Sequence, residues 1–178
     1  FVSSSSVYGQ QQGEWIDETS PTVAAGYSGR VMLEAEQIAL NSGIPASIVR
    51  LTGIYGPGRE WLLTQVRRGY RVAVDPPLFA NRIHADDAAG LMACLLEADR
   101  RGVVLDDVYI GVDDAPAALA DVVGWLREYL GVTEWAEDAT VRRTGSKRCS
   151  NARARALGWT PKYPSFREGY AAIIEGNG

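Results

Sequence analysis

The sequence is poor in the residues that build metal and redox centres. It contains one histidine, His84, and two cysteines, Cys94 and Cys149, which lie far apart and in no metal-binding spacing. We therefore expect no metal site. Nothing favours a disulfide between the two thiols, so we expect a reducing, cytoplasmic compartment, with Cys94 in a core and Cys149 in a loop.

Excess positive charge and long apolar runs are lacking as well. The 178 residues include 18 Lys and Arg against 22 Asp and Glu, a formal net charge of −4. With no basic stripe to neutralise phosphates, nucleic acid is not the expected partner. No apolar run is long enough to cross a bilayer, so no membrane partner is expected either. The strongest basic cluster is short and interrupted, which is more typical of a solvated loop, and the alternative is that it meets one anionic ligand; it comprises Arg142, Arg143, Lys147 and Arg148.

The chain opens inside a strand pattern. Phe1 is followed directly by Val-Ser-Ser-Ser-Ser-Val-Tyr, and a buried first strand needs neighbours with which to pair. We therefore expect the sequence to be a fragment of a longer protein.

Strand and helix patterns alternate along the chain. Hydrophobic residues make up 46% of it, enough for about one domain. Apolar runs bounded by turn residues predict strands at 1–7, 44–54, 71–74, 81–84 and 103–111. Apolar periodicity predicts helices at 28–41, 61–69, 86–98, 117–130, 151–157 and 165–175. A strand, a helix and a strand at this spacing form a βαβ unit, so we expect an α/β fold with a parallel sheet.

The helix predicted at 28–41 has two distinct faces. Ser28 can cap its start and Gly43 can stop it. The core-facing side is expected to carry Val31, Ala35, Ile38 and Ser42, and the wet side Arg30, Glu34, Gln37 and Asn41.

Four serines, Ser3 to Ser6, stand at the end of the first predicted strand. In an open parallel sheet, ligands bind beyond the carboxyl ends of the strands. A hydroxyl there can donate a hydrogen bond to a substrate carbonyl or oxyanion. The same serines also suit a solvated cap on a strand, and the sequence leaves both interpretations open.

Four stretches of the chain carry a recognisable pattern. They are Ser3 to Gly9 (Ser-Ser-Ser-Ser-Val-Tyr-Gly), Arg50 to Gly58 (Arg-Leu-Thr-Gly-Ile-Tyr-Gly-Pro-Gly), Asn81 to Asp87 (Asn-Arg-Ile-His-Ala-Asp-Asp), and Asn151 to Pro161, ending in Ala-Leu-Gly-Trp-Thr-Pro. In this order they resemble extended short-chain dehydrogenase/reductases, the NAD-dependent epimerase/dehydratase family. The resemblance implies the C-terminal part of a Rossmann-like doubly wound parallel sheet. Residues 1–57 would belong to the NAD(P)-binding domain, and residues 58–178 to a small α/β substrate-binding region interleaved with the remaining sheet.

The family's signature, Tyr-x-x-x-Lys, is altered in this sequence. In the family the Tyr is the general acid/base, and the Lys lowers its pKa and binds the nicotinamide ribose. Tyr27 is followed four residues later by Val31, whereas Arg30 stands three residues on. Arg30 could stabilise a Tyr27 phenolate and bind the ribose. Alternatively, Arg30 pairs with Glu34 on a wet helix face and Tyr27 is a loop aromatic.

The resemblance also implies binding residues elsewhere in the chain. Ser4 takes the position of the family's active-site hydroxyl, so the implied catalytic residues are Ser4, Tyr27 and Arg30. Cofactor contacts are implied at Arg30, Thr52, Gly53 and Ile54, and substrate contacts at Ser5, Arg82 and Arg143. Gly53 replaces a frequent Asn and Ala80 a common basic residue, and both changes weaken the case for a nucleotide sugar. Arg143 equally suits a surface loop.

The remaining polar groups are expected to be structural. His84, just before a predicted helix, suits a hydrogen-bonding residue better than an acid/base or a ligand. The adjacent acidic pairs suit caps and turns; they are Asp86-Asp87, Asp106-Asp107 and Asp113-Asp114.

Together these features indicate an NAD(P)-dependent epimerase/dehydratase or reductase in the intact protein. Its substrate would be a sugar, a nucleotide sugar or a related carbonyl or alcohol, with NAD or NADP as the cofactor. The alternative is a non-catalytic NAD(P)-binding or regulatory protein that has kept the fold and lost the Tyr-Lys chemistry. Family members commonly dimerise through the helix after the active-site Tyr, so a homodimer through residues 28–41 is expected. Its second apolar edge carries Met32, Leu33 and Leu40.

The 178-residue chain by itself is expected to bind NAD(P) weakly. Its sequence contains no Gly-x-x-Gly-x-x-Gly loop, the element that cradles a pyrophosphate at a helix N-terminus. Calorimetric titration of NADH into this chain should therefore show no tight binding, and tight binding would contradict the expectation.

Overall fold

The centre of the fold is a three-stranded parallel sheet. The computed structural model describes residues 1–24, 26–136 and 145–176. The strand order is β1 (Val2–Ser4), β3 (Ile48–Leu51) and β7 (Val108–Gly111), with Val2 opposite Val49 and Ile48 opposite Val108. All four residues of β3 are buried, as the middle strand of a sheet covered on both faces requires.

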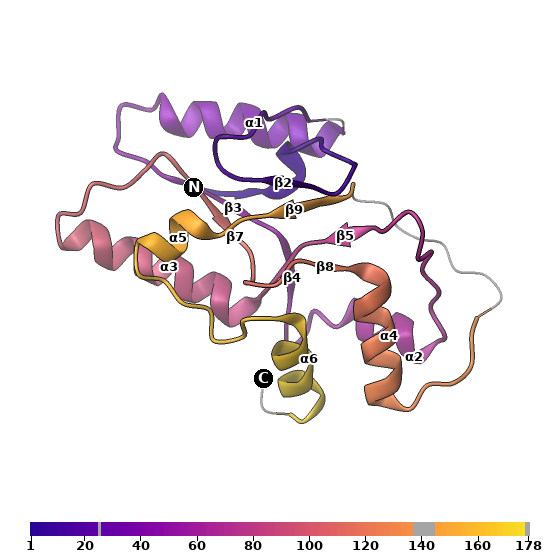
Figure 1. Cartoon of the computed structure of the whole chain (residues 1–178). Coiled ribbons are helices and arrows are strands. Elements are labelled where there is room, and N and C mark those ends of the chain that lie inside the picture. The colour runs from indigo at the N-terminus through magenta and orange to yellow at the C-terminus, as the bar shows by residue number, and fades with distance from the viewer. Residues whose placement is uncertain (25, 137–144, 177–178) are drawn as a thin grey trace.

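Helices cover both faces of this sheet. Neighbouring residues on β7 point to opposite faces, so Tyr109 and Ile110 enter different apolar clusters. The Tyr109 side is covered by α3 (Ala85–Arg100) and α5 (Ala152–Ala156), and the Ile110 side by α1 (Tyr27–Leu40). Figure 1 shows α1 and α3 on opposite sides of the strands. The predicted α/β fold with a parallel sheet is confirmed.

A second apolar core lies beyond one end of the sheet. It joins α2 (Trp61–Arg67), α4 (Leu119–Leu130) and α6 (Phe166–Ile174) around buried side chains such as Leu63, Leu126 and Phe166. A short antiparallel ladder, β5 (Phe79–Ala80) with β8 (Ala117–Ala118), leads into α4. In Figure 1, α2 and α4 stand apart from the central strands. No helix of the described ranges is long and apolar enough to cross a membrane.

Two further ladders join segments that are distant in sequence. β2 (Glu14–Ile16) pairs in parallel with β9 (Lys147–Cys149), and β4 (Gly53–Tyr55) with β6 (Arg82–His84). A 3-10 turn, η1 (Ser5–Val7), follows β1 directly. β9 therefore lies beside the loop that follows the serines.

Several predicted strands differ from the structure. The first strand ends at Ser4 because that residue caps η1. Residues 71–74 form no regular strand, and the strand predicted at 103–111 covers only β7, since Val104 before it is 94% exposed. β2 and β9 lie in segments predicted to be loops; each has three residues, too few for a pattern to show.

The wet face predicted for the helix at 28–41 is confirmed, since Arg30, Glu34, Gln37 and Asn41 are all exposed, but the predicted core face is wrong. Val31 and Ile38 are exposed, whereas Glu36 is buried and Met32 and Leu33 pack against the core. The reason is a partner for Glu36, whose carboxylate accepts two hydrogen bonds from the buried Arg50 guanidinium, at 3.0 and 2.6 Å.

Removing the charge of Glu36 should destabilise the fold strongly. In Glu36→Gln the buried Arg50 loses its only carboxylate partner within the described ranges, a change that costs about 3–5 kcal/mol in free energy of unfolding. The matched control is Glu34→Gln on the exposed face of the same helix, which should change it by less than about 0.5 kcal/mol. Urea unfolding measures both, and equal effects would contradict the structural role of the pair.

Candidate functional site

The carboxyl ends of β1 and β3 open into a cavity of about 230 Å³, which we call the serine cavity. β1 ends at Ser4, and Thr52 follows β3. The lining residues are Ser4, Ser5, Ser6, Thr52, Gly53, Phe79, Ala80, Asn81, Gly145 and Lys147. Because ligands bind at this edge of an open parallel sheet, the serine cavity is the candidate site.

Because side chains alternate between the two faces of β1, Ser3 and Ser4 make different contacts. Ser3 is buried, and its hydroxyl donates to Glu36 Oε1 at 2.5 Å. Ser4 is half-buried, lines the cavity and accepts the N–H of Ser6 at 3.2 Å. The Ser4 hydroxyl thus caps the turn through its oxygen, while its hydrogen remains able to donate to a ligand. The two interpretations of the serines, cap and hydrogen-bond donor, are therefore compatible.

Two of the three residues expected to contact the cofactor after β3 line the cavity. The Thr52 hydroxyl donates to the carbonyl of Gly111 at 3.0 Å, which ties β3 to β7. Gly53 is exposed, and a Cβ there would lie 3.1 Å from the Asn81 carbonyl oxygen, tighter than most contacts. Ile54 is half-buried and packs in the core on the α3 side. The cavity wall here is therefore mostly backbone.

The expected acid/base pair does not line the cavity. Tyr27 opens α1 and is 77% exposed, and Arg30 is exposed one turn later. Within the described ranges Arg30 forms no ion pair with Glu34. The start of α1 nevertheless lies against the serines, because a Cβ on Gly29 would stand 2.5 Å from the Ser6 carbonyl oxygen.

Arg82, one of the two arginines expected to bind substrate, is not among the residues that line the cavity. Arg82 is buried in β6, where its guanidinium lies 5.9 Å from the Phe166 ring and interacts with Tyr170 and Asp113. Arg143 lies outside the described residues.

Asn81 and Lys147 were missed as cavity residues. Asn81 joins β9 on both sides of its amide: Nδ2 donates to the Lys147 carbonyl at 2.8 Å, and Oδ1 accepts the Cys149 N–H at 2.7 Å. Lys147 is only 5% exposed and donates from Nζ to the Tyr8 carbonyl at 2.8 Å. The solvated basic loop predicted around it is therefore wrong for Lys147. The sequence signal for a buried Lys147 is that the residues on either side of Arg148 face inward. This signal can be recognised only once β9 is known to be a strand.

A buried polar network lies beneath the site. Arg50 binds Glu36 through Nε and Nη2 and donates from Nη1 to the Tyr8 hydroxyl at 2.7 Å. Burial raises the pKa of Tyr8 to about 12, although Arg50 acts in the opposite direction. Tyr8 therefore stays protonated at neutral pH.

Other groups considered at the sequence level have structural roles. Burial raises the pKa of Cys149 to about 12, and this thiol lies in β9 rather than in the predicted loop. His84 caps α3 by accepting the Asp86 N–H at Nδ1, 3.2 Å, and Asp87 accepts the N–H groups of Lys162 and Tyr163. Both findings agree with the predicted structural roles. Within the described ranges no group of His, Cys, Asp and Glu could hold a metal ion.

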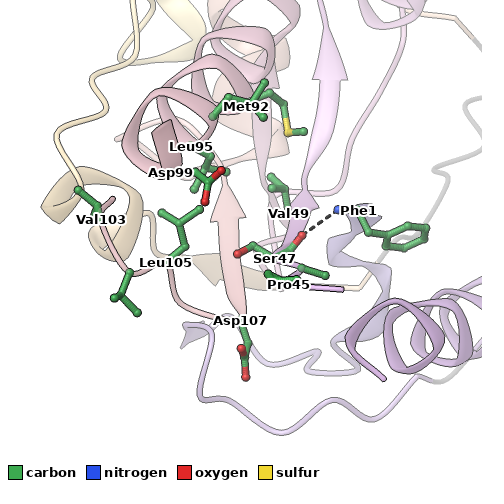
Figure 2. Close-up of a pocket in the computed structure, with 13 residues that line it drawn as sticks. Phe1, Pro45, Ser47, Val49, Met92, Leu95, Asp99, Val103, Leu105 and Asp107 are labelled. Carbon is green, nitrogen blue, oxygen red and sulfur yellow. Dashed lines mark hydrogen bonds between the residues drawn. The ribbon is translucent and has the colours of Figure 1, made fainter. Parts of the chain in front are cut away.

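A larger groove, about 700 Å³, lies at the opposite edge of the sheet. Figure 2 shows Phe1, Ser47 and Asp107 along it, and these residues precede β1, β3 and β7. The Phe1 amino group donates to the Ser47 carbonyl there at 2.8 Å. The amino ends of parallel strands are not where such sheets bind ligands, so size alone does not make this groove the site.

Comparisons with curated proteins find partial relatives. No protein-family model matches the sequence. A curated Escherichia coli protein, Protein YeeZ, is 38% identical over 103 residues, covering 57% of this chain and 36% of that protein. A 3-diazoavenalumate denitrifying reductase from a Streptomyces species is 26% identical, covering 87% of this chain and 55% of that protein. The chain thus spans about a third to just over half of these relatives.

Solved structures agree over almost the whole chain. A Methylobacillus flagellatus protein, provisionally named an NAD-dependent epimerase/dehydratase, matches with a TM-score of 0.85 and 38% identity, covering 99% of this chain and 63% of that one. A Bacillus cereus UDP-glucuronic acid 4-epimerase with NAD has a TM-score of 0.77 at 19% identity, covering 99% and 61%. A human epimerase family protein with NADPH has a TM-score of 0.79 at 19% identity, covering 98% and 64%. These two show the shared Rossmann-like fold, and the predicted resemblance is confirmed.

Proposed function

We propose that the intact protein is an NAD(P)-dependent epimerase/dehydratase or reductase, because solved structures of NAD-dependent epimerase/dehydratase proteins share the fold of this chain. The observation that carries the proposal is the position of Ser4 in a cavity at the carboxyl edge of a parallel sheet. The substrate is a sugar, a nucleotide sugar or a related compound that presents a carbonyl or an alcohol.

Ser4 is proposed to bind the reacting oxygen. Its hydroxyl is fixed by the N–H of Ser6 and can donate its hydrogen into the cavity. A donor held in place before the reaction stabilises the negative charge that develops on a carbonyl or alkoxide oxygen. Ser5, on the same wall, is proposed as a further contact to substrate.

The residues after β3 fit the nicotinamide end of a dinucleotide. Gly53 leaves its backbone exposed on the cavity wall, and Thr52 fixes that backbone to β7. We propose that Thr52 and Gly53 form the surface on which the ring lies, while Ile54, which does not line the cavity, remains a proposed cofactor contact without such support. The bound NAD(P) supplies the hydride chemistry, and the protein supplies position and hydrogen bonds.

Tyr27 is the proposed general acid/base, with Arg30 as the cation that biases it and holds the ribose. Support comes from the contact between the start of α1 and the serines at Gly29. In this proposal the first turn of α1 presents Tyr27 to substrate held by Ser4. Arg82 and Arg143 remain proposed substrate contacts without such support.

The second candidate function is a non-catalytic NAD(P)-binding or regulatory protein. The observation that favours it is the exposure of Tyr27 and Arg30, neither of which lines the serine cavity. Under this alternative the serines still bind a ligand, but no residue moves its proton.

Substitution of Tyr27 and Ser4 separates the two functions. In the intact protein, Tyr27→Phe should lower NAD(P)-dependent turnover by about 10²–10⁴-fold, because it removes the proton donor. Ser4→Ala should lower it by about 10²–10³-fold, because it removes a hydrogen-bond donor to the reacting oxygen. Ser42→Ala, exposed at the far end of α1, is the control and should leave turnover unchanged. Full activity of the Tyr27→Phe enzyme would assign the acid/base role to another residue. A wild-type protein that binds NAD(P) but shows no turnover would favour the second function.

We also propose that the intact protein is a homodimer through α1. Besides Tyr27, the exposed apolar residues of this helix are Val31 and Ile38, two turns apart on one face. The predicted Met32 and Leu33 pack inside, and the predicted Leu40 is half-buried. Ile38→Glu should therefore shift the mass measured by light scattering toward the monomer. Ile44→Glu, equally exposed but outside the helix, is the control. A monomeric wild-type protein would contradict the proposal.

A further inference from the structure

Lys147 is a buried cation without a carboxylate partner in the described structure. It is 5% exposed, its one hydrogen bond goes to the uncharged Tyr8 carbonyl, and it enters no ion pair. Glu14 pairs with Lys147 in the ladder between β2 and β9, but its carboxylate lies beyond ion-pair distance from the ammonium and affects it only through the longer-range charge interaction. The Glu14 carboxylate accepts the N–H of Gln12 at 2.8 Å. Burial accordingly lowers the pKa of Lys147.

The Lys147 ammonium group lies close to Gly145, another residue that lines the serine cavity. A Cβ at Gly145 would lie 3.7 Å from Lys147 Nζ, and both residues line the cavity. Gly145 has a φ of +86°, a conformation that favours glycine, so Gly145 itself places no side chain beside Nζ. An ammonium has three donors, and the Tyr8 carbonyl takes one of them.

The position of the ammonium is fixed by its surroundings. β9 pairs with β2 along its whole length, and the Asn81 amide holds the carbonyl of Lys147 itself. A preorganised buried charge that lacks a counter-ion is costly in a folded protein. A ligand that brings a negative charge to this point removes that cost and gains a charge-assisted hydrogen bond.

The surroundings match a carboxylate better than a phosphate. Among the described residues that line the cavity, Lys147 is the one charged residue, so these residues offer a single positive charge. The other polar contributions come from hydroxyls, an amide and backbone, and the cavity of about 230 Å³ is small. A phosphate dianion would leave one charge uncompensated there, whereas a carboxylate would not.

We propose that Lys147 is an anion-binding residue that selects substrates carrying a carboxylate, held in the serine cavity beside Ser4 and Ser5. This inference rests on the proposed function only in taking the serine cavity as the substrate site. It narrows the substrate class to acids whose carboxylate reaches Lys147 while the reacting oxygen reaches Ser4.

Three ligands that differ at one group test the inference. D-Glucuronate, its uncharged methyl ester and D-glucose are titrated into the intact protein, and their dissociation constants are measured by ligand-observed NMR without any turnover. Wild-type protein should bind glucuronate at least about tenfold more tightly than glucose or the ester, as a charge-assisted hydrogen bond provides. If glucuronate and glucose bind equally tightly, or if neither binds, the inference is overturned, regardless of how the variants behave.

Variants locate the preference at Lys147. Lys147→Met should remove it, leaving glucuronate and glucose equal, while Lys147→Arg should retain it. Lys162→Met, which removes an exposed lysine outside the cavity, is the control and should behave as wild type. Circular dichroism checks the fold of each variant, and a folded Lys147→Met protein that still prefers glucuronate would overturn the inference.

Turnover assays distinguish this inference from the proposed function. A glucuronate preference that depends on Lys147 in a protein without NAD(P)-dependent turnover supports the anion site and counts against the proposed function. Turnover with no such preference supports the proposed function and overturns the anion site.

Discussion

The ion pair between Arg50 and Glu36 is the interaction on which the rest of the structure depends. Arg50 lies in the middle strand, where a lone guanidinium would be costly, and Glu36 neutralises it from α1. The same guanidinium holds the Tyr8 hydroxyl, and the Tyr8 carbonyl in turn holds Lys147. One buried charge pair thus aligns the first strand, the covering helix and β9 around the serine cavity.

The chemistry of the cavity follows from this arrangement. Ser3 is committed to Glu36, so alternation along β1 leaves Ser4 facing the ligand. Tyr8 and Cys149 remain protonated because burial raises the pKa of each to about 12. Hydrogen-bond donors and one buried ammonium supply the polar part of the site, which suits a substrate that presents oxygen atoms and negative charge.

The sequence predicted the α/β fold with its parallel sheet, and it predicted correctly those local features that carry short-range signals. The apolar run of β3 and the serines after β1 carry short-range signals, and both lie as expected. Glu36 and Lys147 were placed wrongly or missed, because their burial depends on partners far along the chain, Arg50 and Tyr8. Three-residue strands such as β9 show no period of their own, so the cavity wall they form could not be predicted.

Amide chemical shifts of the intact protein during a titration with NAD test the central claim most directly. If the carboxyl edge of the sheet holds the nicotinamide and the reacting group, the largest shifts should fall on Ser4 to Ser6, Thr52 and Gly53. Residues along the amino-edge groove, such as Ser47 and Asp107, should shift little. Shifts concentrated on that groove, with the serines unmoved, would contradict the account.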